Sequence, residues 1–203
     1  MCRKFSFSAS VFVVILVISM ACAVGASAVG LHQQRALRLA HNSQAPPLIA
    51  PPDVCPPEED LTAGPEEQEQ AMLCMIDYAR LASGLPALTP IESLTGSAEL
   101  KARDILACEE FSHFACGRPF GYWIKASGYT SVPCWRIGEI IAYGRGRYGT
   151  PRSIFIAWMQ SPTHRHVILN HFNQVGVSVK LGNLGYYGRV RVWTGHFGTQ
   201  ECE

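Results

Sequence analysis

The sequence predicts an α+β domain in which helices pack on an antiparallel sheet. Apolar residues recur at helical spacing between residues 65 and 127, whereas period-two alternation concentrates toward the C-terminus. There, Val175, Val177 and Val179 alternate with small residues, and a second alternating run covers residues 190–194. Helices that precede antiparallel strands are typical of α+β domains, because the helices then cover the sheet.

Composition indicates one globular domain with a real core. The chain has 203 residues, of which 48% are hydrophobic and 16% are charged, and its formal net charge is +1. The charge is nearly balanced and basic residues do not cluster along the sequence, which argues against nucleic acid as a partner.

The first 28 residues have the pattern of a signal peptide. Arg3 and Lys4 form a positive start, residues 11–24 are uncharged and apolar, and Ala26-Ser-Ala28 has the small-residue pattern of a cleavage site. An uncleaved N-terminal anchor is the alternative, because the uncharged run continues to Leu31. A lipoprotein cysteine at position 22 is a weaker one. Each interpretation places the domain outside the cytoplasm, either secreted or attached to the cell envelope.

Residues 29–60 are expected to form a disordered, extended spacer. They contain three Pro-Pro pairs and few large apolar side chains, so they cannot bury a core of their own. The domain is then expected to cover residues 61–203.

Cysteine usage agrees with an oxidising compartment. Two of the eight cysteines fall in the leader, which leaves an even set of six and no C-x-x-C pair that would suggest a structural zinc site. The sequence favours one local disulfide, between Cys108 and Cys116, which would close the loop that carries His113. The pairing of the other four stays open: Cys55, Cys74, Cys134 and Cys202.

The first half of the domain reads as helical. A helix over 65–83 has acidic residues in its first turns and Gly84 after its end. Thr89-Pro-Ile-Glu92 has the pattern of a capping box and predicts a second helix from there to about Cys108. A third, short helix is expected over 119–127.

The second half alternates between strands and helices. Residues 137–143 predict a buried strand, and Thr150-Pro151 predicts the start of a helix over 152–160. Pro162 ends that helix and opens a short one, in which His164 and Ile168 share a face. The two final strands are expected to form a hairpin across residues 182–188.

Three short motifs carry candidate chemistry. Phe111-Ser-His113 follows the second helix, Glu139 lies within the apolar run 138–144, and His164 follows Ser161-Pro162. A carboxylate in a buried strand is costly unless donors surround it, so we expect Glu139 to contact His113 and His164. The structural alternative is that each bonds only local backbone groups.

In this order and spacing, the motifs resemble the CAP (SCP-like) superfamily, and most closely its bacterial secreted branch. The resemblance covers about residues 72–198. It implies an α-β-α sandwich with a central cleft lined by His113, Glu139 and His164. In the eukaryotic branch of this superfamily the cleft has two histidines and two acidic residues, and some members bind a divalent metal there.

The chain departs from the family pattern at several positions of the implied site. The helix acid of the eukaryotic branch falls at Ser161, and its late-strand histidine falls at Val192. The bacterial pattern differs from this chain at three further positions, which are Ile140, Thr163 and His166.

The resemblance supports a protein that binds a lipid, a cell-wall polymer or another protein outside the cytoplasm. One alternative is a hydrolase that uses His113, Glu139 and His164 with a metal or as general acid–base groups. A purely structural envelope protein is the weaker alternative. If the three residues converge within about 3–4 Å, they would hold zinc with one open position; a looser arrangement would be a hydrogen-bonded cluster.

We predict that the leader is cleaved after Ala28. The intact mass of the secreted protein checks this, because a cleaved chain begins at Val29. A mass that retains residues 1–28 would support the anchor instead.

Overall fold

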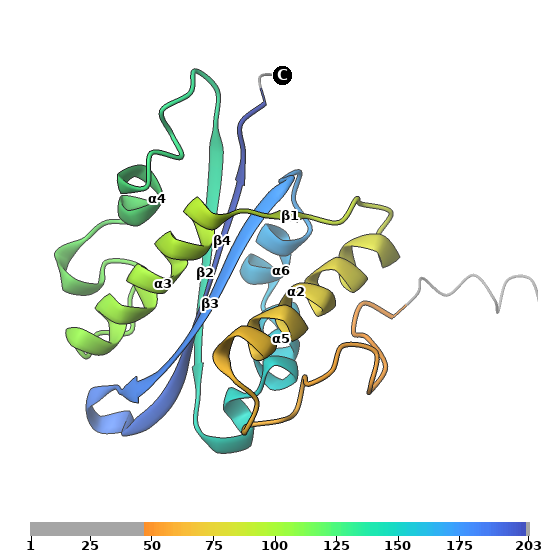
Figure 1. Ribbon diagram of the computed structural model, residues 1–203, viewed down its shortest axis with the longest axis vertical. Helices are drawn as coiled ribbons and strands as arrows, with labels where there is room; N and C mark the ends of the chain where they lie inside the picture. The colour runs from red at the N-terminus through yellow and green to blue at the C-terminus, as the bar shows by residue number, and fades with distance from the viewer. Residues whose placement is uncertain (1–46, 202–203) are drawn as a thin grey trace, which may run out of the picture. The chain divides into compact units, whose positions relative to one another are not determined.

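The computed structural model describes residues 47–201, so the predicted leader, most of the predicted spacer and Cys202 lie outside the described residues. A four-stranded sheet in the order β1-β3-β4-β2 forms the centre, and helices cover both of its faces (Figure 1). This is the α-β-α arrangement that the resemblance implies. Within residues 47–201, no helix combines the length and apolar character needed to span a membrane.

Three long strands build the sheet: β2 (Arg136–Gly144), β3 (Gln174–Asn183) and β4 (Arg189–Thr199). They pair antiparallel, with β4 between the other two. The register places Glu139 of β2 and Gly176 of β3 on either side of His196 of β4. The two last strands are longer than the sequence pattern predicts, because the regular pairing continues to Asn183 and Arg189.

The edge strand β1 (Thr89–Pro90) replaces the helix start that the sequence predicts there. The amides of Thr89 and Ile91 donate to the carbonyl groups of Asn173 and Val175, so the chain runs parallel to β3. Proline fits this position because an edge strand can lack one N–H donor. The capping-box prediction at Thr89 was therefore wrong.

Helices α3 (Glu92–Ala107) and α4 (Tyr122–Ala126) cover one face of the sheet (Figure 1). Helix α3 lies directly against β3, because Gly176 has no side chain to hold it away. A β-carbon at Gly176 would overlap the backbone of Leu94 and Thr95. The glycine thus sets the distance between α3 and the sheet.

The other face carries α2 (Pro65–Ala82), α5 (Pro151–Gln160) and α6 (Pro162–Ile168) (Figure 1). Thr150 caps α5 by accepting a hydrogen bond from the amide of Ser153, as the sequence predicts. The larger apolar core lies between these helices and the sheet; its biggest fully buried side chains are Met72, Met75, Ile76, Phe155, Trp158, Trp193 and Phe197.

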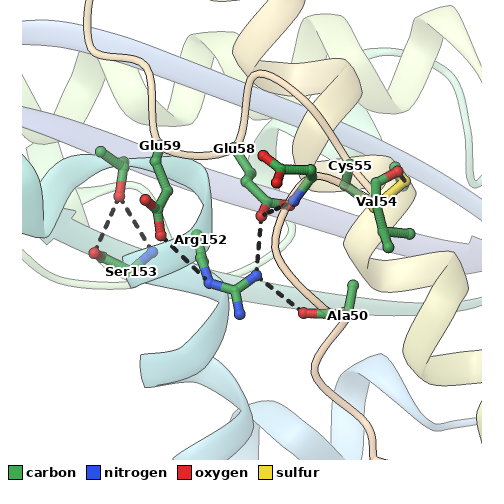
Figure 2. A network of polar contacts seen from close by, with 10 residues as sticks. Ala50, Val54, Cys55, Glu58, Glu59, Arg152 and Ser153 are labelled. Atoms are coloured by element: carbon green, nitrogen blue, oxygen red, sulfur yellow. Dashed lines mark hydrogen bonds and ion pairs between the residues drawn. A yellow bond between two sulfur atoms is a disulfide. The ribbon is translucent and has the colours of Figure 1, made fainter.

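Residues 47–60 pack against the domain, although the sequence predicts them as part of a disordered spacer. Ala50 and Cys55 are fully buried, and Cys55 forms a disulfide with Cys74 of α2. Figure 2 shows the polar contacts that hold the segment: Arg152 of α5 contacts Glu58 at 3.0 Å, Glu59 at 3.5 Å and the carbonyl of Ala50 at 3.0 Å. One disulfide and one arginine thus attach the segment to the domain. The high proline content of the segment does not indicate either contact.

Arg80 of α2 joins that helix to the segment after α6. Its guanidinium is completely buried and donates to four backbone carbonyl oxygens at 2.8–2.9 Å, those of Pro86, Ile168, Asn170 and Phe172. The chain therefore cannot move α6 relative to α2 without leaving a buried charge unbonded.

We predict that Arg80→Met lowers the free energy of unfolding by about 3 kcal/mol or more, because buried carbonyl groups lose their donors at about 1–3 kcal/mol each. Urea unfolding followed by circular dichroism measures the change. Arg103→Met, at an exposed position of α3, is the matched control. A loss below about 1 kcal/mol in the Arg80 variant would contradict this role.

Candidate functional site

A disulfide-closed loop presents His113. Cys108 and Cys116 are bonded, as the sequence predicts, and the loop between them follows the end of α3. Within it, the amide of Phe114 donates to the Ser112 hydroxyl at 2.9 Å. The His113 side chain remains 42% exposed. The loop therefore holds one imidazole at the surface beside the edge strand β2.

Glu139 of β2 lies directly behind His113. Its side chain is only 2% exposed, and its two oxygens are both bonded. Oε1 accepts from His113 Nδ1 at 2.6 Å, and Oε2 lies 2.9 Å from His196 Nε2. The predicted contact between His113 and Glu139 is present, and the second imidazole at this carboxylate belongs to His196.

Glu139 stays ionised because its neighbours compensate for burial. Burial by itself raises the pKa of this carboxyl, but the hydrogen bonds from His113 and His196, together with the nearby charge of Lys101, outweigh it and lower the pKa to about 2. The negative charge of Glu139 is therefore buried between the sheet and α3.

His196 continues the cluster inward. Burial lowers the pKa of its imidazole, against the opposing effect of Glu139, so the ring is neutral near pH 7 and carries one N–H. That N–H must be at Nε2, because the Glu139 carboxylate has no proton to donate. Nδ1 then accepts from the hydroxyl of Ser97, which lies 2.7 Å away on α3.

The hydrogen bond to Glu139 also determines which tautomer the neutral ring of His113 adopts. Its Nδ1–H donates to Glu139, so the neutral ring has a lone pair at Nε2. The exposed part of His113 can thus accept a hydrogen bond or take up a proton. A cation formed there would lie 2.6 Å from the ionised Glu139, which stabilises it.

His164 lies on α6, on a different element from the other histidines. Burial lowers its pKa, and the charge of His113 lowers it further, so the two imidazoles are electrostatic neighbours. No hydrogen bond joins His164 to Glu139 among the described residues. Glu139 contacts His113 and His196 instead, and His164 stands beside this cluster.

As placed, His113, Glu139 and His164 do not form the zinc site that would follow from their close convergence. Within residues 47–201, no group of three His, Cys, Asp or Glu side chains is positioned to hold a metal ion. Both Glu139 oxygens already accept hydrogen bonds, and the Lys101 ammonium adds a positive charge nearby. Zinc binding stays a prediction; the described geometry is a hydrogen-bonded His–Glu–His cluster.

Three residues of this cluster were missed by the sequence reasoning: Ser97, Lys101 and His196. The family pattern placed a late-strand histidine at Val192, but Val192 packs in an apolar cluster with Ile141. The pairing of Glu139 with His196 across the ladder is what selects position 196. The available signal was a lone histidine in the otherwise apolar and small run 192–198, which is the same kind of signal that identified Glu139.

Lys101 lies one helical turn after Ser97 and is only 3% exposed. Burial lowers the pKa of its ammonium, while Glu139 acts in the opposite direction. Its position four residues from Ser97 on the buried face of α3 brings both side chains over the same part of the sheet. The cluster therefore combines groups from α3, β2, β4 and the 108–116 loop.

We predict that Glu139→Gln removes a pH-dependent part of the stability. A depressed carboxyl pKa stabilises the fold above about pH 4.5, and this contribution is lost as pH falls toward 2. The shift corresponds to about 3 kcal/mol at neutral pH. Unfolding free energies measured between pH 7 and 2.5 check it, with exposed Glu110→Gln as control. Parallel pH curves for wild type and the Glu139 variant would contradict it.

The sequence matches a known protein family. Residues 73–197 match the sequence profile described as "CAP: Cysteine-rich secretory protein family". The uncharacterized protein YkwD of Bacillus subtilis (strain 168) is 32% identical over 132 residues, which cover 64% of this chain and 46% of that protein. The chain thus spans about half the length of this curated relative.

Two solved structures share the fold. An outer surface protein from Borrelia burgdorferi has a TM-score of 0.55 and 18% identity, over 67% of this chain and 95% of that one. An extracellular protein containing a SCP domain from Bacillus anthracis str. Ames has a TM-score of 0.51 and 20% identity, over 66% of this chain and 43% of that one. Because the profile match alone covers more than half of the sequence, this chain belongs to the CAP, or cysteine-rich secretory protein, family.

Proposed function

We propose that the protein binds a ligand outside the cytoplasm through the surface that surrounds His113. The observation that carries this proposal is the 2.6 Å hydrogen bond from His113 Nδ1 to Glu139, which leaves Nε2 as an acceptor at the surface. A ligand that offers a hydroxyl or amide N–H could bind there. His164 lies near enough for the charge of His113 to lower its pKa, and it would provide a second polar contact to the ligand.

Aromatic side chains flank this imidazole. Phe114 is 59% exposed and Phe111 is 38% exposed, although both are large and apolar. Phe111 also packs edge-on against Tyr143 of β2, with 4.7 Å between ring centroids. Exposed apolar groups beside a polar anchor are typical of binding surfaces. A lipid, a cell-wall polymer and an extracellular protein each carry both apolar groups and hydrogen-bond donors that could contact such a surface.

A hydrolase is the second candidate, and the same hydrogen bond favours it. His113 Nε2 can take a proton from a water molecule as that water attacks the substrate, and the ionised Glu139 would stabilise the resulting imidazolium. The imidazolium would then give the proton to the leaving group as the substrate bond breaks. The hydrogen bond from His196 and the nearby charge of Lys101 would keep that carboxylate ionised during such a step.

Export to an oxidising compartment is part of the proposal. The disulfides Cys55–Cys74 and Cys108–Cys116 are typical of proteins outside the cytoplasm. The signal-like start of the sequence supports the same location.

We expect His113→Ala to weaken ligand binding about tenfold, because a hydrogen bond of the site is lost while the fold keeps its core. Binding of the secreted protein is measured on insoluble cell-wall polymer and on neutral phosphatidylcholine vesicles. His171→Ala, at another exposed histidine, is the matched control.

The same samples distinguish the two candidates. Release of soluble products by wild type, with a loss of about 10²–10⁴-fold in His113→Ala, would favour the hydrolase. Binding without product release supports the binding protein. Equal binding by wild type and His113→Ala on every probe would refute a ligand site at His113.

A further inference from the structure

Charge is distributed very unevenly along the domain. Residues 140–200 contain six arginines and one lysine but no aspartate or glutamate, whereas the acids of the described chain fall almost entirely before residue 140. The near-zero net charge of the whole chain hides this separation. Positive charge must therefore gather wherever the last third of the chain reaches the surface away from the earlier acids.

Two of these seven cations contact carboxylates. Arg152 contacts Glu58 and Glu59, and Lys180 contacts Glu99 at 2.8 Å. Arg165 donates to the carbonyl of Met159. Arg165 and four further cations have no carboxylate within 4.0 Å among residues 47–201. The four are Arg145, Arg147, Arg189 and Arg191.

The sheet brings these four arginines to one end. Arg191 pairs across the ladder with Gly144, next to Arg145, and Arg189 lies two residues before it at the start of β4. The β-carbon of Arg191 also approaches Gly149, the last residue of the turn that carries Arg147. The turn after β2 and the β3–β4 hairpin both lie at the lower end of the sheet in Figure 1. Basic residues that are separated in sequence are therefore clustered in space.

Arg189 and Arg191 repel each other electrostatically. Burial lowers the pKa of Arg191, and the charge of Arg189 lowers it further; the Arg191 guanidinium donates a hydrogen bond to the carbonyl of Leu61. Arg145, Arg147 and Arg189 are exposed. Glu109 lies beside Gly185 of the hairpin but makes no ion pair with any of these four described arginines. Unneutralised guanidinium groups held together favour an anionic partner.

Exposed tyrosines accompany the arginines. Tyr186 at the hairpin tip is fully exposed, and its neighbour Tyr187 is 51% exposed. Tyr148 is 65% exposed and lies under the guanidinium of Arg147, at 5.1 Å. We call these three tyrosines and the four arginines the basic end of the domain.

We propose that the basic end docks on an anionic lipid bilayer. Arginine binds lipid phosphate groups through its paired N–H donors, and tyrosine is enriched at the level of the lipid headgroups. The two elements are loops that project from one end of the sheet, and a fully exposed Tyr186 at such a tip suits a flat surface. This surface is separate from the His113 site and does not depend on the function proposed for it.

The test is co-sedimentation of the exported, purified chain with phosphatidylcholine vesicles that contain phosphatidylglycerol. We expect binding in addition to that seen on pure phosphatidylcholine vesicles; this added binding requires the anionic lipid and falls as salt is raised from about 0.05 to about 0.5 M, because salt screens exposed charges. Arg145→Gln/Arg189→Gln should weaken it about 25-fold, from about fivefold per arginine. Arg103→Gln/Lys125→Gln removes the same net charge from exposed residues elsewhere and should change it little.

A second variant separates a bilayer from a soluble polyanion. Tyr186→Ser should weaken vesicle binding but leave retention on a heparin column unchanged, because the phenol contributes only at the lipid interface. Equal losses in the two double variants would overturn the assignment of the site. Retention on heparin without binding to anionic vesicles would overturn the bilayer as partner. Binding to pure phosphatidylcholine vesicles and to cell-wall polymer tests the His113 site and should be equal for wild type and Arg145→Gln/Arg189→Gln, which keeps the two proposals distinguishable.

Discussion

The close approach of α3 to β3 at Gly176 is the constraint on which the polar cluster depends. Because position 176 has no β-carbon, the backbone of α3 at Leu94 and Thr95 rests on the strand. Ser97 then reaches His196, the residue that pairs with Gly176 across the ladder. A side chain at position 176 would lift the helix, and with it Ser97 and Lys101. The missing methyl group therefore determines whether His196 keeps its hydroxyl partner and whether Glu139 keeps the nearby ammonium charge.

The cluster balances its charges over a short distance. Among residues 47–201, Glu139 is the only carboxylate whose two oxygens contact histidines, and it lies between the exposed His113 and the buried His196. The Ser97 hydroxyl also lies 2.9 Å from the carbonyl of Leu94, so it has a second acceptor if His196 becomes protonated. The arrangement can thus accept a proton at its inner end without leaving a donor unpaired. The hydrogen bond to Glu139 would hold neutral His113 in one tautomer, both for ligand binding and for acid–base catalysis.

Features with a local pattern could be predicted from the sequence. Helix α5 carries its own cap at Thr150, and the valine alternation marks β3, so both elements appear where expected. The pairing Cys108–Cys116 was also predictable, because the loop is short. The prediction at Thr89 was wrong because this residue pairs with β3 as part of an edge strand instead of capping α3. Strand pairing of this kind depends on residues distant in sequence, so no local pattern predicts it.

The candidate site was predictable in part for the same reason. Glu139 stood out as an acid in an apolar run, and the motif around His113 predicted their contact. His196 stood out as a lone histidine in an apolar run, but its contact with Glu139 depends on the register between β2 and β4, which the sequence does not show. The family pattern led to Val192 instead, four residues earlier on the same strand. Residues 47–60 were misjudged because composition does not show that Arg152 and Cys74 hold them.

The two faces of the sheet are held by groups that respond differently to acid. On the α3 face, the buried link is a carboxylate that must remain ionised. On the α2–α6 face, Arg80 donates to carbonyl oxygens, and neither a guanidinium nor a carbonyl changes its charge between neutral and strongly acidic solution. Acid would thus weaken the polar cluster around Glu139, while the contacts of Arg80 stay bonded. The 108–116 loop that presents His113 is bonded to the acid-sensitive carboxylate.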